Sequence, residues 1–313
     1  MLKLNFETIT PLHISNGNQL AYNLEYIVND DYMAKLNIIK ASKIIANKGL
    51  FDFNRNYKFY EIIKIIEENK NILTDDVFEY KIYAEDSFLE YLRGERRDGR
   101  KIIQEFINSN GKFYIPGSSI KGMLTTILHR DIKRGPLGIN PNNANISDKF
   151  VITDSNFIEP DNFIVDIANR PPSINLITLD PGVEFSSTIR KLGNLLIDDL
   201  RDKLSTYSYS QMKKAEKFVS KFKNMEARPK GATSYYNALE KMLNELNLEN
   251  DEYIVNIGFG GGSYYKLYSD AEIPKFKSKK NRNTEEEAHT TFTVNIQNEL
   301  YQLGWCKLKI EEH

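Results

Sequence analysis

The sequence predicts an α+β fold, because segments with a strand-like alternation of apolar and polar residues are interrupted by amphipathic helical stretches. Two glycine-containing stretches, at 113–128 and 256–268, stand where predicted strands end. At 313 residues the chain is long enough to form one large or two ordinary domains with a buried core.

The first third predicts a strand, a hairpin and then helices. Apolar and polar residues alternate at 2–6, which is typical of a half-buried strand. The stretch 24–37 carries Asp30-Asp31 between two alternating arms and predicts a hairpin with these residues at its tip. Helical spacing follows, most clearly at 60–68, and we expect 38–110 to form a helical insertion.

The rest of the chain repeats this alternation of strands and helices. Strands are predicted at 150–154, 163–168, 174–179, 183–189, 253–257 and 305–310, and helices at 195–223 and 235–246. The order suits two ferredoxin-like, RRM-like units, the first of which carries the insertion. We expect an N-terminal domain at 1–190 and a C-terminal domain with the glycine-rich loop at 191–313.

The composition excludes several classes of protein. The formal net charge is −1, so any nucleic-acid contact must come from local patches. The single cysteine, Cys306, excludes a disulfide framework and a cysteine zinc site, and it suits a reducing cytoplasm. No apolar run approaches a membrane span, and no histidine pair has metal-ligand spacing. We therefore expect a cytoplasmic protein with no membrane contact, no metal and no cofactor.

The stretch FYIPGSSIKGMLTTIL (113–128) predicts a strand, a tight turn and a helix. Gly117, Ser118 and Ser119 stand at the turn, and Lys121 falls in the first helical turn. Free N–H groups at a helix start attract anions, so this junction suits a phosphate. The spacing from Gly117 to Lys121 does not match the longer P-loop pattern, and an ordinary exposed lysine is the alternative.

The stretch NIGFGGGSYYKLY (256–268) predicts a strand that ends in a glycine-rich loop. Gly260, Gly261 and Gly262 let the backbone come close to a ligand or to another segment, and Lys266 follows them. A dinucleotide fingerprint needs a helix directly after the glycines, and none is predicted here. The sequence therefore indicates a loop for close backbone approach.

A basic cluster, KFKSKKNR at 275–282, has no hydrophobic periodicity and is predicted to be a mobile loop. Its charged residues are Lys275, Lys277, Lys279, Lys280 and Arg282. Such a loop can bind an RNA phosphate backbone, and a solvated surface loop is an equal alternative.

Four stretches in this order resemble the RAMP superfamily of CRISPR-associated RNA-binding proteins: ITPLHISNG at 9–17, IPGSSIKG at 115–122, the glycine-rich loop, and LGWCKL at 303–308. The length suits the fifth subunit of type III-A Csm complexes. The resemblance implies a ferredoxin-like fold and a non-catalytic subunit that caps the backbone filament near the 3′ end of the guide RNA (crRNA) and contributes to guide maturation. The implied partners are the guide RNA, the repeated backbone subunit, the small subunit and host nucleases.

Catalysis is not expected. RAMP relatives that process precursor RNA use a histidine as general acid or base, and His13 is the candidate here, also for RNA contact. The favoured alternative is a histidine bonded to local backbone. Related backbone subunits cut RNA with an aspartate in a loop that corresponds to 19–25, which contains no aspartate. Two other functions stay open: an endoribonuclease that uses His13, and a protein–protein adaptor.

Overall fold

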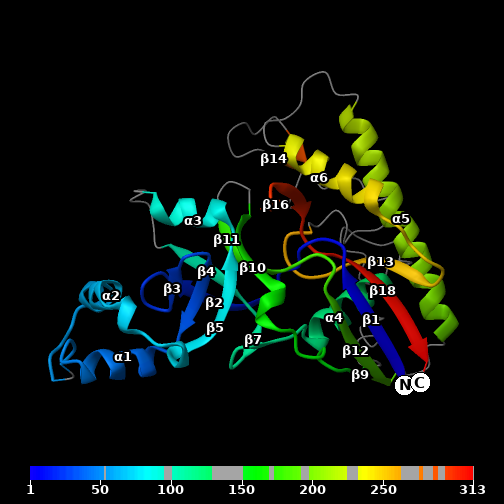
Figure 1. The fold of residues 1–313 in the computed structure, drawn as a ribbon. Helices are drawn as coiled ribbons and strands as arrows, with labels where there is room; N and C mark the ends of the chain where they lie inside the picture. The colour runs from blue at the N-terminus through cyan, green and yellow to red at the C-terminus, as the bar shows by residue number, and fades with distance from the viewer. Residues whose placement is uncertain are drawn as a thin grey trace.

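The computed structural model describes residues 1–52, 54–94, 101–128, 151–168, 173–191, 197–223, 232–261, 275–277, 285–287 and 293–312. These residues form two large β-sheets, one of five and one of seven strands, with helices packed around them (Figure 1). The predicted α+β class is confirmed.

The five-stranded sheet is antiparallel throughout and has the order β13-β18-β1-β12-β9. Its strands are β1 (Leu2–Thr8), β9 (Val151–Ile152), β12 (Glu184–Lys191), β13 (Glu252–Asn256) and β18 (Trp305–Glu312). β1 alternates buried and half-buried residues, as its sequence predicts. Because β1 pairs with β18, the two chain ends lie side by side (Figure 1).

This sheet crosses the domain boundary that we expected after residue 190. β1 and β9 precede the boundary, β12 ends across it at Lys191, and β13 and β18 follow it. The register from Leu2↔Glu312 to Thr8↔Cys306 ties the first strand to the last along its whole length. The hydrogen bonds of a sheet join strands that are far apart in the sequence. The order of strands along the chain therefore did not reveal that β1 pairs with β18.

The seven-stranded sheet is mixed and has the order β2-β6-β11-β10-β5-β4-β3. Its strands are β2 (Ser15–Ala21), β3 (Tyr26–Asn29), β4 (Tyr32–Leu36), β5 (Phe78–Ala84), β6 (Ile102–Phe106), β10 (Phe163–Ala168) and β11 (Ile174–Leu179). The β3–β4 hairpin is confirmed, with Asp30 at its tip in the left-handed region (φ 48°).

The prediction that 38–110 is a purely helical insertion was wrong. β5 and β6 lie inside this range and belong to the seven-stranded sheet. β5 buries every second residue from Tyr80 to Ala84 and exposes Lys81 and Tyr83 between them, a period-two pattern that the helical interpretation of the whole range overlooked.

The described helices in this range are α1 (Ile38–Asn47), α2 (Phe59–Glu68), α3 (Asp86–Arg93) and the short η1 (Lys70–Ile72) and η2 (Asp75–Val77). The helices described elsewhere are α4 (Gly117–Leu128), α5 (Ile197–Lys223), α6 (Ala232–Glu245) and the short η6 (Pro160–Asn162). α1 and α2 share a separate small core with β3 and β4 through Ala41, Ile45 and Ile66. No helix in the described part of the chain is long and apolar enough to cross a membrane.

Three short hairpins complete the described structure. They are β7 (Asn108–Ser109) with β8 (Lys112–Phe113), β14 (Lys275–Lys277) with β15 (Glu285–Glu287), and β16 (Thr293–Ile296) with β17 (Glu299–Gln302). Of the predicted basic loop at 275–282, residues 275–277 form strand β14, whose register sets Lys275 opposite Glu287 and Lys277 opposite Glu285, and residues 278–282 lie outside the described residues.

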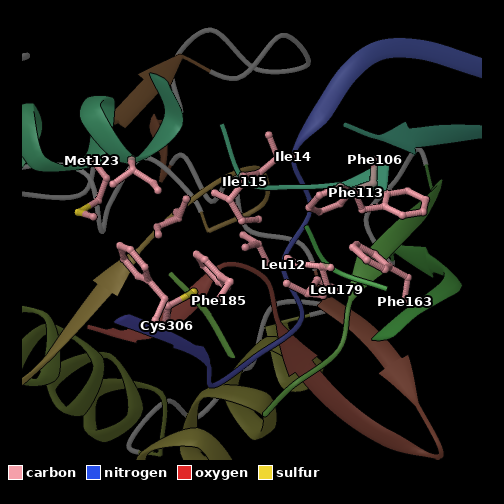
Figure 2. Close-up of a cluster of buried hydrophobic side chains, with 14 of the residues drawn as sticks. Leu12, Ile14, Phe106, Phe113, Ile115, Met123, Phe163, Leu179, Phe185 and Cys306 are labelled. Atoms are coloured by element: carbon pink, nitrogen blue, oxygen red, sulfur yellow. The ribbon is translucent and has the colours of Figure 1, made fainter. Parts of the chain in front are cut away.

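One hydrophobic core joins the two large sheets (Figure 2). Leu12 and Ile14 lie between them, after the end of β1. On the side of the seven-stranded sheet they meet Phe106 and Phe163, and the five-stranded sheet contributes Phe185. The segment from Leu12 to Ile14 contacts both halves of the core. Residues that pack against this segment are therefore held in a fixed position relative to both sheets.

Candidate functional site

The start of α4 is held by its own chain. The N–H of Gly117 donates to Asp154 Oδ1 at 2.8 Å, and the N–H groups of Ser119 and Ile120 donate to the carbonyl of Pro116. The Asp154 carboxylate thus occupies the position at which we expected a phosphate. One anionic partner at this helix start is therefore supplied by the protein itself, and RNA contact at Gly117, Ser118 and Ser119 stays a prediction.

Gly117 is required for packing. A Cβ at this position would stand 2.5 Å from the carbonyl oxygen of Ile152 and 2.7 Å from that of Thr153. These are backbone atoms next to β9, which cannot rotate away as a side chain can. The absent side chain lets α4 start directly against the edge of the five-stranded sheet.

The outer side of α4 remains accessible. Ser118 and Gly122 are exposed, and Ser119 and Lys121 are half-buried. A Cβ on Gly122 would meet nothing within 4 Å, so packing within the described structure does not require a glycine there. A glycine inside a helix destabilises it relative to alanine by about 0.5–1 kcal/mol. Gly122 therefore lowers the stability of α4, and no packing contact within the described structure explains it.

The glycine-rich loop is shaped by close contacts with three segments. Gly258 has φ +78°, and a Cβ there would lie 2.5 Å from the carbonyl oxygen of His13. A Cβ on Gly260 would stand 2.6 Å from the Leu303 side chain. At Gly261 it would come within 2.1 Å of the Asn256 amide. The backbone of the glycine-rich loop therefore comes close to other atoms, as expected, and within the described residues these atoms belong to other segments of the same chain.

A groove of about 270 Å³ lies between α4 and the end of β13. From α4 it is lined by Ser119, Gly122, Met123 and Thr126. From the other side it is lined by Tyr207 of α5 and by residues 256–258. The groove brings together two sequence motifs that lie far apart in the chain. All of its lining side chains are uncharged, so it suits a neutral group better than a phosphate.

Asn256 is the unusual residue of this groove. Its side chain is 4% exposed, yet neither Oδ1 nor Nδ2 has a hydrogen-bond partner among the described residues. Buried amides nearly always have partners. Sequence reasoning missed Asn256 and Tyr207, although an asparagine that ends an apolar strand directly before four closely spaced glycines was a usable signal.

His13 lies in the core. Its ring is 1% exposed, its Nδ1 is 2.7 Å from the carbonyl oxygen of Ile177, and it packs edge-on against Phe106 and Phe259. Burial lowers the pKa of His13 to about 4, against the opposing effect of the bond to Ile177, so the ring is neutral at pH 7. A ring without surface cannot contact RNA, and His13 is therefore withdrawn from the candidate site.

Several predicted site residues are not placed. Gly262, Lys266, Lys279, Lys280 and Arg282 lie outside the described residues. Lys275 and Lys277 are described as backbone in β14 only. Within the described ranges, no group of three or more His, Cys, Asp or Glu side chains could hold a metal ion.

The two motifs and the fold together define a class of protein. The chain belongs to the RAMP superfamily, whose sequence model matches residues 5–265. Among curated proteins it is similar to Csm5 of Methanocaldococcus jannaschii, with 27% identity over 128 residues. This alignment covers 40% of the chain and only 29% of the length of that relative. The resemblance to the RAMP superfamily and to its Csm5 members is confirmed.

Solved structures share the fold. A chain in a Csm–crRNA–target RNA ternary complex of a type III-A CRISPR–Cas system has a TM-score of 0.67 and 16% identity, with 99% of this chain and 100% of that chain covered. The crystal structure of T. onnurineus Csm5 has a TM-score of 0.55 and 16% identity, over 82% of this chain and 90% of that one. At these identities the similarity concerns the fold alone.

Proposed function

We propose that the protein is a non-catalytic RNA-binding subunit of a type III-A CRISPR ribonucleoprotein. In this role it caps the filament of backbone subunits near the 3′ end of the guide RNA and contributes to guide maturation. Its partners are the guide RNA, the repeated backbone subunit, the small subunit and the nucleases that trim the guide, and its site of action is the cytoplasm. The similarity to a chain of a Csm–crRNA–target RNA complex supports this assignment.

The observation that carries the proposal is the groove between α4 and β13. It is built mainly from two of the four stretches by which the chain resembles its family, and Gly122 leaves the helix backbone bare at its wall. Proteins that hold single-stranded RNA through its backbone and shape need such close approach. Lys121 stands in the same helical turn, where it can meet a neighbouring phosphate, and the basic residues at 275–282 remain predicted RNA contacts.

The absence of catalysis is supported by the state of His13. A general acid or base must reach the atom that it protonates, and the His13 imidazole is enclosed by Phe106, Phe259 and the Ile177 carbonyl. The His13 endoribonuclease that the sequence left open has no support from this geometry. A pure protein–protein adaptor is the remaining alternative, and the RNA-binding measurements below distinguish it from the proposed function.

The order of elements also supports part of the predicted ferredoxin-like layout. β1, α4, β9, β12, α5 and β18 follow one another as β-α-β-β-α-β, and their strands form adjacent members of one antiparallel sheet. We propose that this set is one ferredoxin-like unit into which the seven-stranded sheet is inserted, and that the second unit is contained in that sheet.

Gly122→Ala tests the groove directly. The substitution should stabilise the protein by about 0.5–1 kcal/mol, because alanine is the better helix former and nothing lies within reach of the new methyl group. It should weaken binding of a labelled single-stranded RNA by about tenfold, because the methyl group fills part of the groove wall. Urea unfolding and fluorescence anisotropy measure the two effects.

Ser205→Ala is the control, because Ser205 is exposed on α5 and does not line the groove. It should leave RNA affinity unchanged. Unchanged RNA affinity in Gly122→Ala would contradict the assignment of the groove.

Lys121→Ala should fold normally and no longer bind one RNA phosphate. For a single strand, removing one lysine–phosphate interaction lowers the slope of log affinity against log salt by about 0.7. The variant should also be under-represented in purified complexes that carry full-length guide. Lys43→Ala, at an exposed position of α1, is the control. Equal salt slopes for both variants would mark Lys121 as ordinary surface.

A further inference from the structure

We infer that the exposed pair Tyr32 and Tyr83, with the carboxylates of Asp31 and Asp86 beside it, forms a docking surface for an arginine-bearing segment of a partner protein. We call these four residues the tyrosine surface. The inference goes beyond the proposed RNA contacts, because it names the chemistry of a protein partner and does not depend on the groove between α4 and β13.

The tyrosine surface lies on a strip of the seven-stranded sheet that other elements leave open. Tyr32 on β4 stands opposite Tyr83 on β5 in the strand register. Ala34, two residues further along β4 and so on the same face, belongs to the small core that α1 and α2 cover. Ile164, which pairs with Tyr83 from β10, belongs to the cluster that the β16–β17 hairpin covers. The two covers therefore end on either side of the tyrosines.

Both tyrosines are accessible. Tyr32 is 49% exposed and Tyr83 is 38% exposed, whereas Ala34 and Ile164 are buried. The two rings pack edge to face, with centroids 6.1 Å apart and an interplanar angle of 83°, so each ring fixes the orientation of the other. Large side chains that are exposed together on a sheet face mark an interaction site more often than single ones do, and tyrosine is enriched in interfaces.

The surroundings of the two rings are acidic. Asp31 at the hairpin tip and Asp86 in the first turn of α3 are both exposed. Burial raises the pKa of Tyr83, and neighbouring carboxylates, among them Asp86 and Asp31, raise it further. Lys81, which shares this face of β5 with Tyr83, is already paired with Asp75 at 2.7 Å. The charge that the tyrosine surface presents to a partner is therefore negative.

This combination of rings and carboxylates selects the partner. A negative surface repels the phosphates of RNA and attracts a basic protein segment. A guanidinium group can stack on an aromatic ring and at the same time donate a forked pair of hydrogen bonds to a carboxylate. A lysine ammonium is a more strongly hydrated point charge without this planar geometry. The tyrosine surface therefore fits arginine better than lysine.

Fluorescence anisotropy tests the inference with short labelled peptides in which arginine, lysine or glutamate alternates with glycine, each titrated with the purified full-length protein. The arginine peptide should bind about threefold more tightly than the lysine peptide, and the glutamate peptide should not bind. Tyr32→Thr/Tyr83→Thr should weaken binding of the arginine peptide by about tenfold, because both rings are lost while threonine retains the preference for a strand. Tyr60→Thr is the control, since Tyr60 is 63% exposed but lies on α2, outside the tyrosine surface.

Asp31→Asn/Asp86→Asn tests the charge separately and removes no packing. This variant should weaken binding of the arginine peptide by about fivefold at low salt, and its affinity should depend less on salt than that of the wild type. Asp199→Asn/Asp202→Asn makes the same change of net charge at exposed positions of α5 and should leave the affinity unchanged. If urea unfolding shows that the tyrosine variant has lost its fold, the comparison of these two aspartate variants decides.

Each failure has a separate meaning. A wild type that does not bind the arginine peptide, or aspartate variants that both bind as tightly as the wild type, would overturn the inference. Equal affinities for the arginine and lysine peptides would overturn the preference for arginine. A labelled single-stranded RNA is titrated separately, because arginine peptides themselves bind RNA. A tyrosine variant that loses affinity for this RNA and not for the peptide would assign the surface to RNA and contradict the inference, whereas a wild type that binds the peptide but no RNA contradicts only the proposed function.

Discussion

Gly117→Ala should destabilise the protein by about 3 kcal/mol or more, the largest effect that we expect from a single methyl group. The new Cβ would stand 2.5 Å from the Ile152 carbonyl oxygen and 2.7 Å from that of Thr153. Overpacking of a rigid site typically destabilises by about 1–3 kcal/mol, and here two backbone carbonyls must move together. The shift should also break the hydrogen bond from Gly117 to Asp154, which removes the cap of α4.

Gly122→Ala on the same helix is the matched control. Both variants add one methyl group to α4, but only the first meets other atoms. Urea unfolding at constant pH measures both, and we expect opposite signs. A Gly117→Ala protein as stable as the wild type would mean that α4 can move away from β9 at no cost in stability. Packing would then not require glycine at this position, and ligand binding would be the remaining reason for it.

Glu105→Ala should destabilise the protein by about 3–5 kcal/mol, because Tyr80, Asn16 and Asn18 lose their acceptor and Lys35 keeps only its ion pair with Glu79. Glu105 is fully buried on β6. It accepts hydrogen bonds from Lys35 Nζ at 2.7 Å, Tyr80 Oη at 2.8 Å, Asn16 Nδ2 at 2.8 Å, Asn18 Nδ2 at 3.0 Å and Asn108 Nδ2 at 3.0 Å.

These bonds close the seven-stranded sheet on itself. β6 is separated from β5 by β11 and β10 in the strand order, yet its Glu105 bonds Tyr80 of β5 and Lys35 of β4. The sheet must therefore curl until strands that are not neighbours face each other. One carboxylate holds this curled form, which explains the large expected effect.

The same network predicts an acid dependence of stability. Burial opposes ionisation of Glu105, but the hydrogen bonds from Lys35, Asn16, Asn18 and Tyr80 outweigh it and lower its pKa from 4.5 to about 2. The contribution is fully present above the unfolded-state pKa near 4.5 and is lost as the pH falls toward 2. The free energy of unfolding of the wild type should therefore fall between pH 5 and pH 2, by about 1 kcal/mol or more from this group.

Glu105→Gln separates charge from shape. It should keep part of the network at pH 7 and should lose the Glu105 share of the acid dependence, so its unfolding free energy should change less between pH 5 and pH 2. Glu90→Ala, at an exposed position of α3, controls for general loss of negative charge. Identical acid dependence in wild type and Glu105→Gln would show that the network does not hold the ionised carboxylate.

The sequence by itself determined the local structure and the family. The alternation at 2–6, the hairpin tip at Asp30-Asp31 and the long helical stretch at 195–223 were all predicted correctly. Each depends on a period of two or 3.6 residues or on turn chemistry, which neighbouring residues carry among themselves. The strand β5 has the same period of two from Tyr80 to Ala84, but the helical interpretation of the whole range 38–110 overlooked it.

Only the tertiary structure shows which of these segments contact one another. It paired β1 with β18, set Asp154 at the start of α4, enclosed His13 in the core, and joined α4 to β13 around Asn256. These contacts join residues far apart in the chain. Local propensities do not specify these contacts, because they form only when the two sheets bury their apolar faces in one core. The packing of that core then determines which buried polar groups have a hydrogen-bond partner.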